Sequence, residues 1–126
     1  MRVVDTVVLW VAGLSLLGFG IAFCVAPLAT FAAAGLLLEG PVAATELRAF
    51  YGGLELALGG LMLACAMRPA RRRDGLVLVF AVFAGIGVTR LFAMLASGAD
   101  TSFLRAALAT ELALALLAGF ALMRRS

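Results

Sequence analysis

The sequence predicts an all-α integral membrane protein: a four-helix bundle with a short interfacial helix between the first and second spans. Of its 126 residues, 65% are hydrophobic and only 13% are charged, which is about half the charged share of a soluble domain. Four apolar stretches have the length of roughly 20 residues that a helix needs to cross a bilayer. These stretches are residues 6–26, 46–67, 75–97 and 104–123. They form a single membrane domain over residues 1–126, with no stretch left for a soluble domain.

The arginines that flank the four stretches gather on one side of the expected membrane. They precede the first span, fill the loop after the second and follow the fourth: Arg2, Arg68, Arg71, Arg72, Arg73, Arg124 and Arg125. Because cytoplasmic loops carry an excess of Lys and Arg, both termini are expected in the cytoplasm. An even number of spans also requires the termini to share one side, which agrees with the count of four.

A short apolar segment connects the first two spans. Pro27 is expected to end the first helix, and residues 28–38 are too few to cross a bilayer. They are typical of an interfacial helix, with Gly40 and Pro41 expected to end it and Thr45 expected to cap the second span. Two roles remain open for this segment, a lid over the polar residues of the second span or a plain surface connection, and we favour the connection.

The second span carries charged side chains at a depth where hydrocarbon is expected. Arg48, Gly52, Glu55 and Gly59 follow an i, i+4, i+7, i+11 spacing, which places them along one face of an α-helix. Tyr51 stands beside that face. Ionisable residues inside a membrane are costly, pair with one another and mark functional sites.

Four glycines in the same span remove side-chain bulk. They are Gly52, Gly53, Gly59 and Gly60. Small residues in membrane helices let another helix approach closely, so we expect these glycines to form a packing surface. The alternative is that they leave a cavity for the head group of a ligand.

Two later spans supply partners for the charges of the second. Arg90 of the third span and Glu111 of the fourth lie at similar depth, and Glu55 is slightly deeper. The planar guanidinium suits bidentate pairing with a carboxylate. Two arginines and two glutamates nearly cancel, as a buried cluster requires. The predicted polar cluster or ligand-binding group therefore consists of Arg48, Tyr51, Glu55, Arg90 and Glu111.

The residue types that are missing exclude several kinds of chemistry. The chain has no histidine and no lysine, so it offers no imidazole base, no histidine-ligated metal or haem and no Schiff-base amine. Its serines lack a nearby general base, which gives acyl transfer little support. No catalytic residue, no metal site and no cofactor is expected, and the net charge of +3 does not indicate a nucleic-acid partner.

Three sequence pieces resemble a known family. The stretch E-L-R-A-F-Y-G-G-L-E-L-A-L-G-G at residues 46–60, T-R-L-F around Arg90 and E-L-A-L at Glu111 are similar to the domain of unknown function 4345 family of small bacterial membrane proteins. The resemblance implies four spans in the bacterial inner membrane and no known activity. The family's recurrent positions correspond here to Arg48, Tyr51, Gly52, Gly53, Arg90 and Glu111.

Three classes of function fit these features. The one we favour from sequence is a structural or accessory membrane protein whose buried Arg/Glu cluster fixes helix register. The second is a binder or proton-coupled transporter of a small anionic or amphipathic ligand. The third, which we favour least, is an enzyme that acts on a lipid or quinone. Membrane lipids are the expected partners, with a larger membrane complex or a homo-oligomer as the candidate assembly.

Overall fold

The computed structural model describes residues 2–125, which fold as helices joined by short connections, with no strand among them. The elements are α1 (Arg2–Val25), α2 (Pro27–Ala33), α3 (Gly40–Glu46), the π-helix η1 (Leu47–Gly53), α4 (Leu54–Met67), the 3-10 turn η2 (Pro69–Arg71), α5 (Arg72–Ser97) and α6 (Ser102–Met123). The helical stretches Val3–Val25, Gly40–Met67, Pro69–Ser97 and Ser102–Met123 are long and apolar enough to cross a membrane. The predicted all-α fold with four long apolar helices is confirmed.

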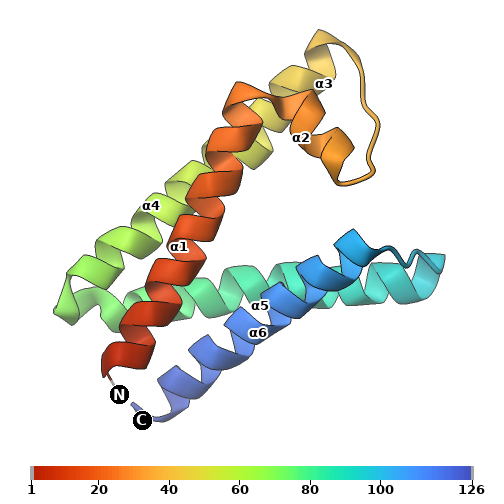
Figure 1. The fold of residues 1–126 in the computed structure, drawn as a ribbon. Helices are drawn as coiled ribbons and strands as arrows, with labels where there is room; N and C mark the ends of the chain where they lie inside the picture. Colours follow the sequence, from red (N-terminus) through yellow and green to blue (C-terminus); the bar gives the residue numbers. More distant parts are fainter. Residues whose placement is uncertain (1, 126) are drawn as a thin grey trace.

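The long helices form two antiparallel hairpins, as Figure 1 shows. In the first hairpin α1 packs along η1 and α4, and in the second α5 packs along α6. The hairpins meet at the end that holds both chain termini and diverge toward the other end. We call the first the basic end, because it holds residues 68–73 and 124–125, and the second the open end, which holds α2, α3 and the connection at residues 98–101.

A buried apolar core joins all four long helices on the side of the basic end. It consists of Val8, Leu9, Ala12 and Leu16 of α1, Met62 and Ala66 of α4, Leu76, Val79 and Phe83 of α5, and Leu114, Ala115, Ala118 and Ala121 of α6. In water, the burial of such side chains is the main contribution to the free energy that holds helices together. In a membrane, close packing of the side chains stabilises the helix contacts instead. Toward the open end this shared core stops, and η1 makes no close contact with α5 or α6.

The connection between the first two long helices differs from the sequence prediction. The short helix α2 ends at Ala33 rather than at Leu38, and Gly35 follows with a φ of +84°. Gly40 and Pro41 open α3 instead of ending a helix, because proline fits the first turn, where its missing N–H is not needed. Thr45 lies inside α3, where its hydroxyl donates to the Pro41 carbonyl at 2.7 Å, so it is not a cap.

Two of the four glycines in the second long helix lie against α1. A Cβ atom at Gly59 would approach the Gly13 carbonyl oxygen to 2.7 Å, and one at Gly52 would approach Cys24 Sγ to 2.6 Å. Gly53 and Gly60, expected in the same surface, lie outside it: Gly60 has no neighbouring atom within 4 Å, and Gly53 faces only its own helix. Gly60 follows the packed Gly59 by one position, which turns it about 100° away around the α-helix.

Candidate functional site

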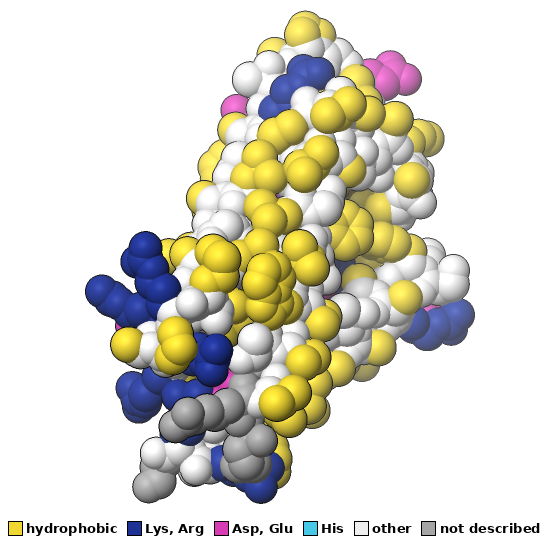
Figure 2. All heavy atoms as spheres, turned by 60° about the vertical axis from the view of Figure 1, so that its left-hand side comes forward, with side chains coloured by type: hydrophobic (Ala, Val, Ile, Leu, Met, Phe, Trp, Pro, Cys, Tyr) yellow, Lys and Arg dark blue, Asp and Glu magenta, His cyan; other side chains and the backbone are white. Residues whose placement is uncertain are grey.

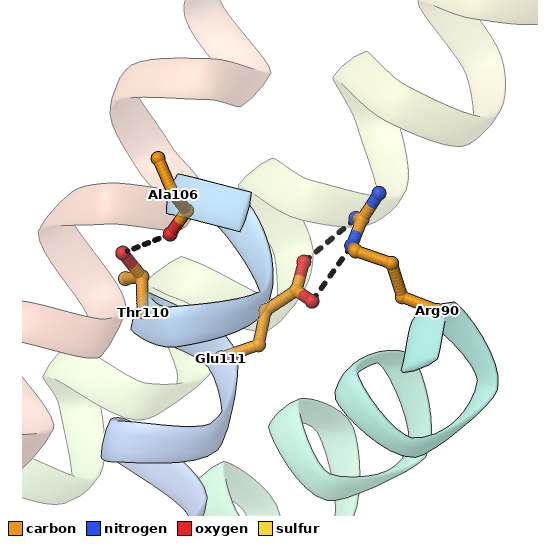
Figure 3. A network of polar contacts seen from close by, with 4 residues as sticks. All are labelled: Arg90, Ala106, Thr110 and Glu111. Carbon is orange, nitrogen blue, oxygen red and sulfur yellow. Dashed lines mark hydrogen bonds and ion pairs between the residues drawn. The ribbon is translucent and has the colours of Figure 1, made fainter. Parts of the chain in front are cut away.

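Arg90 and Glu111 form the bidentate pair that the sequence predicts. The guanidinium Nε donates to Glu111 Oε2 at 2.8 Å, and Nη2 donates to Oε1 at 2.7 Å (Figure 3). The side chains are 28% and 11% exposed. Gly87, one turn before Arg90, lets α6 come close, since a Cβ there would lie 3.3 Å from Glu111 Cβ. The pair therefore joins α5 to α6 at the same depth in the two helices.

One edge of the Arg90 guanidinium is left free by this pairing. Its third nitrogen, Nη1, points away from Glu111 in Figure 3 and has no hydrogen-bond partner among residues 2–125. Arg90 also borders an open hollow of about 510 Å³ on the second hairpin near the open end. The lining is mostly apolar and consists of Gly85, Ile86, Thr89, Arg90, Ala93, Met94, Ser97, Ala99 and Leu104. The hollow is open rather than enclosed, so it covers one side of a bound molecule, whereas most small-molecule sites surround their ligand.

Arg48 pairs with a backbone carbonyl rather than with a carboxylate. Its Nε donates to the carbonyl oxygen of Cys24 at 3.1 Å. Cys24 lies in the last turn of α1, where helix carbonyls lack partners within the helix, and an arginine is a favourable partner there. Arg48 thus joins η1 to the end of α1 and takes no part in an ion pair among the described residues.

Tyr51 belongs to an aromatic group that joins α1, α2 and η1. Its ring centroid lies 5.0 Å from that of Phe23 and 5.6 Å from that of Phe31, and these two lie 6.2 Å apart. Such ring spacings are favourable beyond the area they bury. Tyr51 is 43% exposed. Its ring therefore joins η1 to α1 and α2 while part of the residue stays accessible at the open end.

Glu55 is the residue without a partner. Its Oε2 is buried and accepts no hydrogen bond from residues 2–125. Leu58 and Met62, three and seven positions further along α4, pack in or against the shared core, so Glu55 lies on the same helix face. Glu55 lies one turn beyond Leu58 in the direction of the open end and is not itself part of the shared core. Arg90 lies at the comparable position on α5, because it follows the core residue Phe83 by seven positions, two helical turns further toward the open end.

The π-helix η1 explains why the predicted cluster is divided. Its seven residues, Leu47–Gly53, include Arg48 and Tyr51, and π-helical hydrogen bonds run from i to i+5 instead of i to i+4. The spacing from Arg48 to Glu55 was read with α-helical periodicity, which does not apply across this segment. π-helical turns occur frequently at functional sites. The adjacent glycines Gly52 and Gly53 were the sequence signal for an irregular segment here.

A second buried ion pair, at the basic end, was not predicted. Arg125 donates from Nε to Asp5 Oδ2 at 3.0 Å, and its Nη2 contacts the same oxygen. The two side chains are 29% and 10% exposed. The pair ties the end of the chain to the start of α1. The sequence places both termini on the same side of the membrane, and this is the signal that could have suggested an ion pair between them.

The geometry defines the class of protein: an all-α protein of two hairpins, with four helices apolar enough to span a membrane and one buried carboxylate oxygen, Glu55 Oε2, that has no partner among residues 2–125. The chain belongs to the family described as a domain of unknown function (DUF4345), which matches residues 4–122. The resemblance found in the sequence is thereby confirmed, and the match includes all five predicted site residues. No curated protein and no solved structure matches the chain.

Proposed function

We propose that the protein is a multi-pass protein of the bacterial inner membrane that binds a small amphipathic ligand between its two hairpins at the open end. The observation that carries this proposal is the buried, unpaired Glu55 Oε2. A buried oxygen without a hydrogen bond costs free energy, and native proteins rarely tolerate one without a reason. A ligand that donates to Glu55 supplies that reason.

A purely structural cluster fits the geometry less well. Such a cluster needs its charges to neutralise one another, yet only Arg90 and Glu111 do so. Arg48 is satisfied by the Cys24 carbonyl, and Glu55 by nothing among residues 2–125. The charges that would have completed the cluster, Arg48 and Glu55, therefore do not neutralise each other in the folded chain.

The free groups define the chemistry of the ligand. Arg90 Nη1 and the Tyr51 hydroxyl can donate, which suits a head group with acceptor oxygens, such as a carboxylate or a phosphate. Glu55 can accept from a hydroxyl or amine of the same head group, or carry a proton. The apolar hollow beside Arg90 suits a hydrocarbon portion. These features support an amphipathic molecule with both acceptors and a donor in its head.

The orientation follows from the arginines. The basic end holds Arg68, Arg71, Arg72, Arg73, Arg124 and Arg125, and an excess of arginine marks the cytoplasmic side. We therefore place both termini in the cytoplasm and the ligand opening toward the periplasmic side.

Mass spectrometry of the purified protein tests the binding proposal. We expect a defined amphipathic molecule to remain with the wild-type protein in mild detergent and to fall at least about tenfold in Glu55→Leu, which removes one charged hydrogen-bonding group. Arg105→Gln is the matched control, because Arg105 is exposed at the same end and pairs only with Asp100. Equal retention by wild type and Glu55→Leu would show that Glu55 does not bind the ligand.

A structural or accessory role is the second candidate, and one observation favours it. The bidentate Arg90–Glu111 pair fixes α5 against α6 without needing a ligand. In this role the partner is a larger membrane complex or a second copy of the chain. Native mass spectrometry distinguishes the two candidates, because the accessory role predicts a retained protein partner and no retained small molecule.

A further inference from the structure

We propose that the basic end is a docking surface for the head groups of anionic phospholipids. This surface lies at the opposite end of the molecule from the ligand opening, and the inference does not depend on it. It consists of the arginines of the α4–α5 connection and those after α6: Arg68, Arg71, Arg72, Arg73, Arg124 and Arg125. In Figure 2 dark-blue side chains gather toward this end, beside a large hydrophobic surface.

Four of these arginines have no carboxylate to neutralise them among residues 2–125, and one of the four is held by a backbone carbonyl. The two carboxylates near this end are already paired, Asp5 with Arg125 and Asp74 with Arg71 at 3.3 Å. Arg72 donates to the Ala66 carbonyl at 3.4 Å. The remaining arginines, which take part in no ion pair, are Arg68, Arg73 and Arg124.

The unpaired arginines lie directly beyond the apolar surface. Met67 is 65% exposed and precedes Arg68, and Met123 is 70% exposed and precedes Arg124. The Arg124 guanidinium lies over the Phe120 ring, 4.9 Å from its centre, so this arginine covers the last apolar turn of α6 and keeps its charge at that edge. With the apolar surface in hydrocarbon, these guanidinium groups reach the depth of the lipid phosphates.

The packing holds this surface together, and its chemistry matches phosphate. Ala66, Leu76 and Ala121 belong to one buried core, so the ends of α4 and α6 and the start of α5 are fixed next to one another. Guanidinium groups bind phosphate oxygens through two parallel hydrogen bonds. A fixed set of uncompensated guanidinium groups at phosphate depth attracts anionic lipids over zwitterionic ones.

Competition between two lipids tests the docking surface. The purified protein is mixed with equal amounts of phosphatidylglycerol and phosphatidylcholine that carry the same acyl chains, and native mass spectrometry counts the lipids bound. Each arginine near an anionic lipid contributes about a fivefold preference, so we expect wild type to favour phosphatidylglycerol by roughly 100-fold. The variant Arg68→Gln/Arg73→Gln/Arg124→Gln should bind both lipids about equally.

Controls separate this surface from general effects of charge. Arg105→Gln, at the open end, should keep the wild-type preference. Raising the NaCl concentration should weaken the preference of the wild-type protein, a measurement that needs no variant and stands even if the triple variant fails to fold. The proposal is overturned if wild type binds both lipids equally, if the folded triple variant keeps the preference, or if an equal concentration of inorganic phosphate displaces the lipid.

Discussion

Two buried ion pairs at opposite ends of the molecule have almost the same exposure but different surroundings. Arg90 and Glu111 are 28% and 11% exposed, and Arg125 and Asp5 are 29% and 10% exposed. Near the basic end the pair stands beside a core shared by all four long helices. The pair near the open end lies outside that core, and the first hairpin carries Glu55, whose Oε2 is buried without a partner among residues 2–125. The comparison shows that a buried pair alone does not distinguish the two ends, and that the proposed binding role depends on the unpaired Glu55.

The packing differs in the same way between the two ends. At the basic end the hairpins pack against each other, with Leu9 of α1 close to Gly75 of α5. At the open end each hairpin packs within itself, Gly52 against Cys24 and Gly87 against Glu111, and η1 makes no close contact with the second hairpin. The hairpins are therefore held together mainly at the basic end, which is consistent with the proposed ligand opening at the other end.

The largest expected effect comes from removing one member of either ion pair. We expect Glu111→Ala and Asp5→Ala each to lower the free energy of unfolding by about 3 kcal/mol, because each leaves a poorly solvated arginine without its carboxylate. Unfolding in detergent, followed by circular dichroism, measures both. The double replacement Arg90→Ala/Glu111→Ala should recover part of the loss.

Ligand retention then distinguishes the two pairs. Asp5→Ala should leave the amount of bound ligand unchanged, since Asp5 lies at the basic end, while Glu111→Ala should alter it by releasing Arg90. If Asp5→Ala and Glu111→Ala reduce ligand retention equally in folded protein, the proposal that the ligand binds at the open end only is wrong.

A smaller effect is expected where the hairpins meet. A Cβ atom at Gly75 would lie 2.6 Å from Cys65 Cβ and 2.7 Å from Leu9 Cδ2, so Gly75→Ala must push the hairpins apart and should cost about 2 kcal/mol. Gly85→Ala is the control on the same helix, because no atom lies within 4 Å of its Cβ position. We expect Gly85→Ala to be neutral or to stabilise by up to about 1 kcal/mol through helix propensity. Thermal unfolding of the two variants compares them directly.

Replacing the unpaired carboxylate should stabilise the protein. Glu55→Leu removes a buried oxygen that no described group satisfies, and we expect a gain of about 1 kcal/mol in the free energy of unfolding without ligand. The same variant should lose the ligand, which is the trade between stability and function that binding sites often show. A loss of stability in ligand-free protein would mean that Glu55 has a structural partner in the folded chain.

Sequence patterns were sufficient for the features that depend on one helix or on depth alone. The four long apolar helices follow from the length of the apolar stretches. The Arg90–Glu111 pair follows from two opposite charges at the same depth in adjacent antiparallel spans, together with the geometry of a guanidinium and a carboxylate.

Sequence patterns could not predict the features that depend on irregular backbone or on how the two hairpins pack together. The π-helix changes the direction of Arg48 relative to Glu55, and α-helical spacing carries no information about it. Asp5 and Arg125 lie 120 positions apart, so their pairing depends on the arrangement of all four long helices. Gly40 and Pro41 fit either the end or the start of a helix, and only the tertiary structure decides between them.

The smallest effect on stability is expected from a variant that removes the Tyr51 hydroxyl and keeps the ring. In Tyr51→Phe the ring remains against Phe23 and Phe31, so the free energy of unfolding should change by less than about 0.5 kcal/mol, as for a partly exposed site. The hydroxyl is a hydrogen-bond donor at the open end, and its removal should weaken ligand retention about fivefold, the value of one neutral hydrogen bond. Phe31→Leu is the opposite control, because it disturbs the aromatic contact and leaves the hydroxyl. We expect Phe31→Leu to lower the free energy of unfolding and leave ligand retention unchanged. We expect Tyr51→Phe to keep the free energy of unfolding and lower ligand retention. Together these results would show that the aromatic rings stabilise the open end and that the Tyr51 hydroxyl binds the ligand.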